Sequence, residues 1–182
     1  MKWQTKIFED VLDYEQPTKY LVSSTDYKDE FSTPVLTAGK TFILGNTNEK
    51  NGIFPKEKLP VIIFDDFTTA TKFVDFPFKA KSSAMKILHA KKGIADVKFL
   101  FYLMQTIIFT HDQHKRYWIS EFSKIEILLP PLTEQIKIVK KVDKLLQKID
   151  EAKKINTEVA FELKALSSSI LNKAFKKEEK IL

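Results

Sequence analysis

The sequence feature that most constrains the fold is an uninterrupted helical pattern that follows two adjacent prolines. Pro130 and Pro131 cannot lie inside a helix and hold the chain extended. Thr133 then supplies an N-cap, and Glu134 adds a negative charge to the first turn. From there to about Phe175 the sequence contains no glycine and no proline. We therefore predict one helix of roughly 40 residues that is about 60 Å long.

Apolar residues recur along this helix with alternating four- and three-residue spacings, the heptad repeat of a coiled coil. A single helix with one apolar seam requires a partner, so we predict dimerisation. The alternative is an amphipathic helix that lies on its own domain, although a small domain cannot cover so long a helix. The predicted seam consists of Ile138, Val142, Leu145, Ile149, Ala152, Asn156, Val159, Leu163, Leu166 and Ile170.

Asn156 is the polar residue of this seam. A lone Asn at such a position usually fixes register and orientation at some cost in stability. In an antiparallel pair it would face Ala152 of the partner subunit, which leaves room for the amide. In a parallel pair it would face its own copy, and the sequence does not choose between the two.

The residues before the prolines have a β-rich pattern with one internal helix. Asn51-Gly52 is a hairpin signal, and residues 95–109 have the spacing of a buried helix. Predicted strands cover residues 41–44 (closed by Gly45-Asn46), 61–64, 72–76, 84–88 and 125–129. We predict an α+β fold: a mixed α/β domain with a β-rich core over residues 1–132, then one long coiled-coil helix over residues 133–182.

Polar loops between these strands are the candidate binding surface. Loop 65–71 is rich in hydroxyls that suit phosphates and base edges, and residues 79–92 contain five lysines and no acid. Segment 111–118 adds basic and aromatic side chains. For each loop the alternative is an ordinary solvated turn. The candidate DNA-binding residues are Thr68, Thr69, Thr71, Lys72, Lys79, Lys81, Ser82, Ser83, Lys115, Arg116 and Tyr117.

The net charge of +6 is weak evidence for a nucleic-acid partner, because the segment from Glu134 onward supplies +4 of it. Among the thirty basic residues, Arg116 is the single arginine. Lysines give point-charge phosphate contacts more readily than bidentate contacts to bases. The positions of the basic residues are therefore more informative than the net charge.

The sequence offers little for catalysis. Its four glycines are far apart, so no glycine-rich phosphate or cofactor loop exists, and Leu129-Pro130-Pro131-Leu132 lacks the polar first residue of a methyltransferase motif. Asp65-Asp66 with Asp96-Val97-Lys98 outlines a metal-dependent nuclease site, although Asp96 also suits a helix start. His111 and His114 lack a third metal ligand. We predict no catalytic or metal residue.

The absence of cysteine excludes disulfides and cysteine-ligated metals. The sequence shows no signal peptide and no long apolar span, so a cytoplasmic protein without membrane association is expected.

Three segments resemble one protein family. Pro130-Pro131-Leu132-Thr133-Glu134-Gln135, followed by a Lys-rich helix, is similar to the conserved region of specificity subunits of type I restriction–modification systems. The opening from Trp3 to Val11, and Phe99-Leu100-Phe101-Tyr102-Leu103, resemble the start and the helix of their target-recognition domains. Full-length members hold two such domains and two spacer helices, so the resemblance implies a half-length subunit.

The resemblance implies a non-catalytic subunit that binds double-stranded DNA. It also implies docking to methyltransferase (modification) and restriction subunits, with S-adenosylmethionine, ATP and Mg²⁺ used by those partners and no cofactor in this chain. Combined with the seam, it predicts a homodimer that recognises a bipartite target. A coiled-coil adaptor that binds no DNA and a metal-dependent nuclease are the alternatives.

Overall fold

The computed structural model describes residues 2–39, 41–111 and 113–176; residues 1 and 177–182, the outer ends of the two predicted domains, lie outside the described residues. The chain divides into two compact units, with Val139 closing the first and Lys140 opening the second. The predicted α+β class is confirmed, since a β-rich part precedes helix α4 (Leu132–Lys176), which has 45 residues.

The first unit contains one four-stranded antiparallel sheet, a second sheet of three strands and a two-stranded ribbon. The large sheet has the order β2-β8-β5-β6, the second sheet has the order β4-β3-β7, and the ribbon pairs β1 with β9. The strands are β1 (Gln4–Ile7), β2 (Leu12–Glu15), β3 (Thr33–Leu36), β4 (Ile43–Thr47), β5 (Val61–Asp65), β6 (Thr71–Val74), β7 (Lys79–Ala80), β8 (Met85–Ala90) and β9 (Glu126–Leu129).

Strand β5 explains why both faces of the large sheet are buried. Successive side chains of a strand point to opposite faces. Ile62 and Phe64 lie in one apolar cluster, whereas Val61 and Ile63 lie in the other, and all four are fully buried. The continuous apolar run predicted as a buried strand is thereby confirmed.

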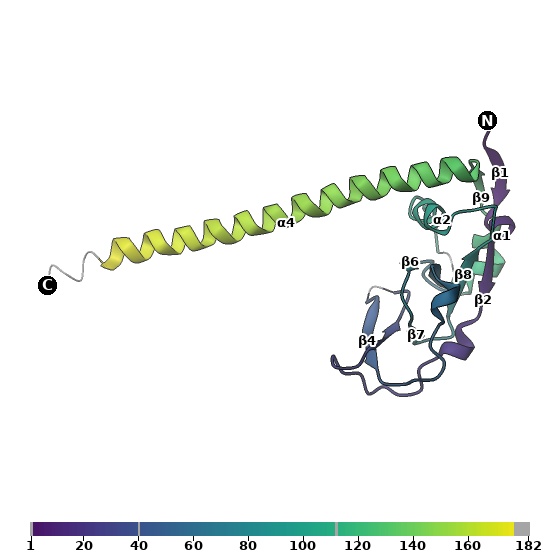
Figure 1. Ribbon diagram of the computed structural model, residues 1–182, viewed down its shortest axis with the longest axis horizontal. Coiled ribbons are helices and arrows are strands. Elements are labelled where there is room, and N and C mark those ends of the chain that lie inside the picture. The colour runs from purple at the N-terminus through teal and green to yellow at the C-terminus, as the bar shows by residue number, and fades with distance from the viewer. Residues whose placement is uncertain (1, 40, 112, 177–182) are drawn as a thin grey trace. The chain divides into compact units, whose positions relative to one another are not determined.

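Short helices connect and cover the strands. The first cluster includes Phe99, Leu100 and Met104 from α2, together with Trp118 and Phe122. Figure 1 shows β1 beside β9, so the two ends of this unit meet in one ribbon. The helices are α1 (Phe8–Val11), α2 (Val97–Met104) and α3 (Tyr117–Ser120), with the 3-10 helices η1 (Pro17–Tyr20), η2 (Lys56–Lys58) and η3 (Phe122–Lys124).

Several local predictions were wrong in detail. The predicted strand at 41–44 begins two residues later and continues through Gly45 and Asn46 to Thr47. Asn51-Gly52 does not form a hairpin, because it joins β4 to β5 and these belong to different sheets. The predicted helix 95–109 is reduced to α2, although Asp96 caps it as expected by accepting a bond from Phe99 N. The other three predicted strands are present with ends shifted by one or two residues.

The start of α4 differs from the prediction by one residue. The helix begins at Leu132, so Thr133 lies inside it and is not the N-cap. The carbonyl of Pro131 accepts bonds from Glu134 N and Gln135 N. Proline suits this position because the first N–H groups of a helix have no intrahelical acceptor, so a missing N–H costs nothing there. Ile138 and Val139 pack against the first apolar cluster.

Gln135 gives the proline segment a structural role. Its side chain is fully buried and bonds to three backbone groups. Oε1 accepts from Asp96 N at 2.8 Å, while Nε2 donates to Pro130 O at 2.8 Å and to Ile94 O at 3.2 Å. The first turn of α4 is thus fixed to the N-terminus of α2. No helix among the described residues is both long and apolar enough to cross a membrane.

Candidate nucleic-acid interface

Two loops that are about forty residues apart in sequence meet through side-chain contacts. One is the tip of the β5–β6 hairpin, which we call the threonine loop (residues 65–71), and the other is the segment before α3, the histidine–arginine loop (the described residues of 110–116). The Phe67 and His114 rings stack with centroids 4.6 Å apart and 4° between their planes. Thr69 Oγ1 lies 3.1 Å from His111 Nε2. The two loops therefore form one surface.

The threonine loop is held in shape by its own first residue. Asp65 Oδ1 accepts bonds from Phe67 N and Thr68 N, both at 2.9 Å, and Asp65 N donates to Ala70 O. Thr69 has a φ of +54°, an unusual conformation for a β-branched residue. Such strain persists only where surrounding contacts enforce it. The tip of this hairpin is thus a defined structure.

A buried acid beneath the loops ties three segments together. Asp66 Oδ2 lies 3.0 Å from Lys86 Nζ, with both side chains 1% exposed, and Oδ1 accepts from Trp118 N at 2.9 Å. Oδ2 accepts no hydrogen bond from the described residues, so its contact with Lys86 is an ion pair without a hydrogen bond. The Asp66 backbone also bonds to Ala84 O and Tyr117 N. Both loops and the turn before β8 share this anchor.

The predicted residues of the histidine–arginine loop have different surroundings. Arg116 is exposed, with its guanidinium carbon 6.0 Å from the centroid of the Phe67 ring. Lys115 is paired with Glu121. The candidate residue Tyr117 is buried together with Trp118, so it lies in the core and not on the binding surface, and its hydroxyl donates to Gln113 O. Arg116 is therefore the accessible cation beside the stacked rings.

Some of the predicted residues on the remaining loops are exposed, and the others contact neighbouring residues. Thr68, Ser82 and Ser83 are exposed, while Thr71 accepts a bond from Gln105 and the Lys72 ammonium lies over the Phe42 ring. Lys79 is 3% exposed and is bound by Glu49 and Asn51 O. Lys81 Nζ lies 3.2 Å from the Tyr27 hydroxyl. Lys79 thus has a structural partner.

Glu49 is electrostatically adapted to this pair. The hydrogen bond from Lys79 is the main reason that the pKa of Glu49 lies below its ordinary value, and bonds from Ser24 N and Ser23 N add to the effect. The pair joins β7 to the segment after β4. Lys79, predicted as a DNA-binding residue, therefore belongs to this structural pair and not to the candidate interface.

The carboxylates of the nuclease alternative have structural partners. Asp66 belongs to the buried anchor, Asp65 closes the threonine loop, and Asp96 caps α2. Among the described residues, no group of three His, Cys, Asp or Glu side chains is arranged to hold a metal ion. The geometry assigns these acids to structure.

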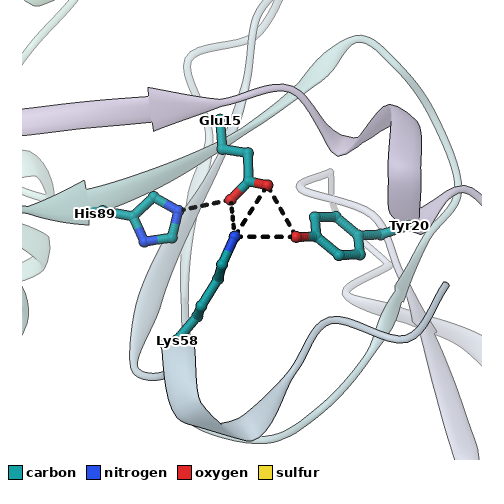
Figure 2. Close-up of polar contacts among 4 residues, drawn as sticks. All are labelled: Glu15, Tyr20, Lys58 and His89. Atoms are coloured by element: carbon teal, nitrogen blue, oxygen red, sulfur yellow. Dashed lines mark hydrogen bonds and ion pairs between the residues drawn. The ribbon is translucent and has the colours of Figure 1, made fainter.

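A second polar cluster joins β2, η1, η2 and β8 (Figure 2). Glu15 accepts bonds from the Tyr20 hydroxyl at 2.9 Å and from Lys58 Nζ at 3.1 Å, and His89 Nε2 lies 3.2 Å from it. Burial would raise the pKa of Glu15, but the bonds from Tyr20 and Lys58, with the charges of Lys58 and His89, lower it overall. The cluster stabilises the charged carboxylate.

The same contacts raise two other pKa values. The bond to Glu15 is the main cause of the raised pKa of Lys58. Burial, followed by the bond to Glu15, raises the pKa of Tyr20. The cluster is therefore at its strongest with Glu15 charged, Lys58 charged and Tyr20 neutral, and we interpret it as a structural clamp.

Sequence reasoning found the threonine loop and Arg116 but missed their partners. Phe67 and His114 are separated by more than forty residues, so their stacking has no local signature. Lys86 did carry a signal, because a lysine within the apolar run of β8 indicates a buried counter-charge.

The chain is similar to one family of known proteins. Residues 1–160 match the family model described as the type I restriction modification DNA specificity domain. The specificity subunit of the type I restriction enzymes EcoR124I and EcoR124II from Escherichia coli is 50% identical over 145 residues. That match covers 74% of this chain and 36% of the relative.

Solved structures share the fold at low identity. A chain from a study of complex assembly and conformational transition in a type I R-M system has a TM-score of 0.67 at 18% identity, covering 96% of this chain and 46% of that one. The type I S subunit from M. genitalium has 0.60 at 15%, covering 83% and 41%. The HsdS subunit from Thermoanaerobacter tengcongensis has 0.56 at 19%, covering 96% and 45%. The chain spans less than half the length of each relative.

Proposed function

The chain belongs to the family of type I restriction modification DNA specificity domains, and we propose that it is a DNA specificity subunit that acts as a homodimer. In this proposal residues 1–132 recognise one half of a bipartite duplex target, and the helix from residue 133 onward joins two copies. Methylation and cleavage are carried out by modification and restriction subunits, which use S-adenosylmethionine, ATP and Mg²⁺.

The observation that carries this proposal is the convergence of the threonine loop and the histidine–arginine loop. Together they present hydroxyls, a histidine pair and the single arginine on a surface held by a buried ion pair. Hydroxyl and cationic side chains are the usual partners of phosphate oxygens and base edges. Binding residues are commonly carried on loops that a rigid scaffold holds in place.

The proposed homodimer is supported by the exposed seam of α4. Leu145, Ile149, Val159, Leu163, Leu166 and Ile170 are each between 47% and 60% exposed. Ile138 also packs against the core of the first unit, so it serves the domain as well as the seam. A row of apolar side chains this long is covered in solution by a partner helix.

A further set of apolar side chains supports docking of the modification subunits. Phe161 and Phe175 are two heptads apart and therefore share one face of α4, and Leu171 is one turn before Phe175. They lie off the seam and are 74%, 67% and 58% exposed. We propose this outer face as a docking surface, and Phe161→Ser with Phe175→Ser should weaken assembly with modification subunits while leaving the homodimer intact.

DNA binding itself is tested by salt dependence. Replacing Lys72 and Lys81 with Ala should weaken binding to all duplexes, and should flatten the dependence of log K on log salt by about one unit per lost phosphate contact. Lys92→Ala, which removes an exposed lysine that is not among the candidate DNA-binding residues, is the matched control. A native chain with no salt-dependent duplex binding would favour a coiled-coil adaptor.

The absence of chemistry in this chain is a separate test. Incubation of DNA with the purified chain, Mg²⁺, ATP and S-adenosylmethionine should leave the DNA intact and unmethylated. Cleavage that disappears in Asp65→Asn or Asp96→Asn, with folding unchanged, would establish the nuclease alternative.

A further inference from the structure

We infer that Arg116 contacts a guanine in the major groove of the target, and that Phe67 and His114 position its guanidinium. This inference rests on the proposed function and deepens it. It separates one base-specific contact from the lysine and hydroxyl contacts, which are directed at the backbone. It also assigns a role to the strained tip of the threonine loop.

The side chain of Arg116 has the chemistry of a guanine contact. Arginine presents a planar fork of donors that matches O6 and N7 of guanine, and this is the commonest base-specific contact in protein–DNA complexes. Lysine supplies the chain's other basic residues and suits phosphates as a point charge. The single arginine is exposed and lies on the surface where the two loops meet.

The surroundings of Arg116 are preorganised. Its guanidinium lies at cation–π distance from Phe67, whose ring is stacked flat on His114. An aromatic face holds a guanidinium in one orientation without using its donors, so the donors stay directed at a ligand. A flexible arginine would have to lose rotamer freedom on binding, and a positioned one loses less.

The backbone that carries Phe67 and Arg116 is rigidly held. Phe67 stands between the buried anchor residue Asp66 and the strained Thr69, and its backbone N–H is bound by Asp65. Tyr117 N and Trp118 N, directly after Arg116, bond to the same Asp66. The backbone carbonyl and the carboxylate of the buried Asp66 thus fix the segment directly after Arg116, and Asp66 itself precedes the Phe67 ring.

The test is selection of bound sequences from a random duplex library by the full-length chain. The native chain should enrich a motif that contains a guanine at one fixed position. Arg116→Ala and Arg116→Lys should both lose preference at that position alone, by roughly tenfold to a hundredfold. Arg116→Lys keeps the charge, so its binding to unrelated duplexes should stay close to native.

Replacing that guanine with 7-deazaguanine tests the contact to a single atom of the base. The change removes the N7 acceptor and should weaken native binding by roughly tenfold, while Arg116→Ala should bind both duplexes equally. Phe67→Ala should lose the same preference as Arg116→Ala, because the positioning face is gone. Phe67→Tyr retains the face and should retain the preference, which separates positioning from a general folding role.

Three results would overturn the inference. If the arginine variants bind every duplex more weakly but select an unchanged motif, Arg116 is a phosphate contact, and the proposed DNA-binding function still stands. If the native chain selects no motif at all, the proposed function fails and this inference fails with it. Sensitivity to 7-deazaguanine that persists in Arg116→Ala would likewise exclude Arg116 as the contact.

Discussion

Lys86 Nζ lies 3.0 Å from Asp66 Oδ2, and both side chains are 1% exposed. A pair removed from water so completely is costly to form, but breaking it by removing one partner is costlier, because a bare charge stays buried. The Asp66 carboxylate also accepts the Trp118 amide, and its backbone bonds to Ala84 and Tyr117. This pair therefore supports the two loops proposed to contact DNA.

Lys86→Met should destabilise the domain by about 3–5 kcal/mol, because it leaves Asp66 buried and charged. Lys86→Met combined with Asp66→Asn removes both charges and should recover a substantial part of that loss. Lys92→Ala removes an exposed lysine and serves as the control. Chemical denaturation of the four proteins provides the measurement. If Lys86→Met is as stable as the native chain, the ion pair contributes nothing to stability.

Gln135→Ala should destabilise the first unit by about 2–4 kcal/mol, since it leaves Asp96 N, Pro130 O and Ile94 O without their side-chain partner. Gln147→Ala, an exposed glutamine of the same helix that bonds only to Glu151 among the described residues, is the matched control and should change stability by less than about 0.5 kcal/mol. Equal effects in denaturant unfolding would contradict the clamp assigned to Gln135.

The Glu15 cluster should make stability depend on pH. Because the folded-state pKa of Glu15 is lowered, its stabilising contribution is present above the ordinary carboxyl pKa of about 4.3 and is lost as the pH falls through the lower folded value. The pKa values of Lys58 and Tyr20 are raised, so their contributions are complete below about pH 10 and are lost above it.

Glu15→Gln should therefore cost about 1 kcal/mol on a plateau between roughly pH 5 and 9, and the difference from the native chain should shrink below about pH 4. The measurement is the free energy of unfolding of both proteins across this range. Glu57→Gln, which changes an exposed glutamate on the same short helix as Lys58, is the control. A difference that stays constant down to pH 3 would exclude the charge of Glu15 as its source.

How much of the fold the sequence predicted depended on whether the signal was local. Val61 to Phe64 form a strand buried on both faces, and their apolar run states this directly. By contrast β1 and β2 were not predicted, because β1 is half-exposed and pairs with β9, more than one hundred residues away. Only the pairing partner makes such a segment a strand.

Local signals also failed where tertiary contacts overrode them. Asn51-Gly52 was predicted as a hairpin, but Gly52 adopts a φ of +65° in a connection. A Cβ at Gly52 would lie 2.7 Å from the carbonyl oxygen of Lys19, so the glycine is required for a close approach of two chain segments. At the candidate site, Arg116 and the threonines were visible in the sequence, whereas the Phe67–His114 stack and the Lys86–Asp66 pair depend on contacts between distant segments.

Asn156→Leu should tighten association of the helices and loosen their choice of register or orientation. In an antiparallel pair with Asn156 facing Ala152 of the partner subunit, the other eight seam residues all face apolar partners, and Ile149 faces Val159 of the partner subunit. Sedimentation would measure how tightly the helices associate. Disulfide trapping between a Cys introduced at residue 149 of one copy and a Cys introduced at residue 159 of the other would measure their orientation. A variant that dissociates more readily than the native chain would remove Asn156 from the seam.

The last prediction concerns helix length and target spacing. A two-fold dimer should recognise inverted half-sites, and α4, with 45 residues, is about 68 Å long. Deleting residues 152–158 removes one heptad with the Ala152–Asn156 pair and leaves the other four antiparallel pairs matched. The half-sites should then move closer by about 10 Å, or about 3 base pairs.

The measurement is sequencing of the sites methylated by complexes that carry the native or the shortened chain. The half-site sequences should be unchanged, because the deletion leaves the threonine loop and Arg116 intact, while the gap between them should shrink. Asn156→Leu changes the same pair without changing the length, so its spacing should equal the native one when it assembles antiparallel. A gap that is unaffected by the deletion, or a target that is not split, would mean that α4 joins subunits but does not set the distance between the half-sites.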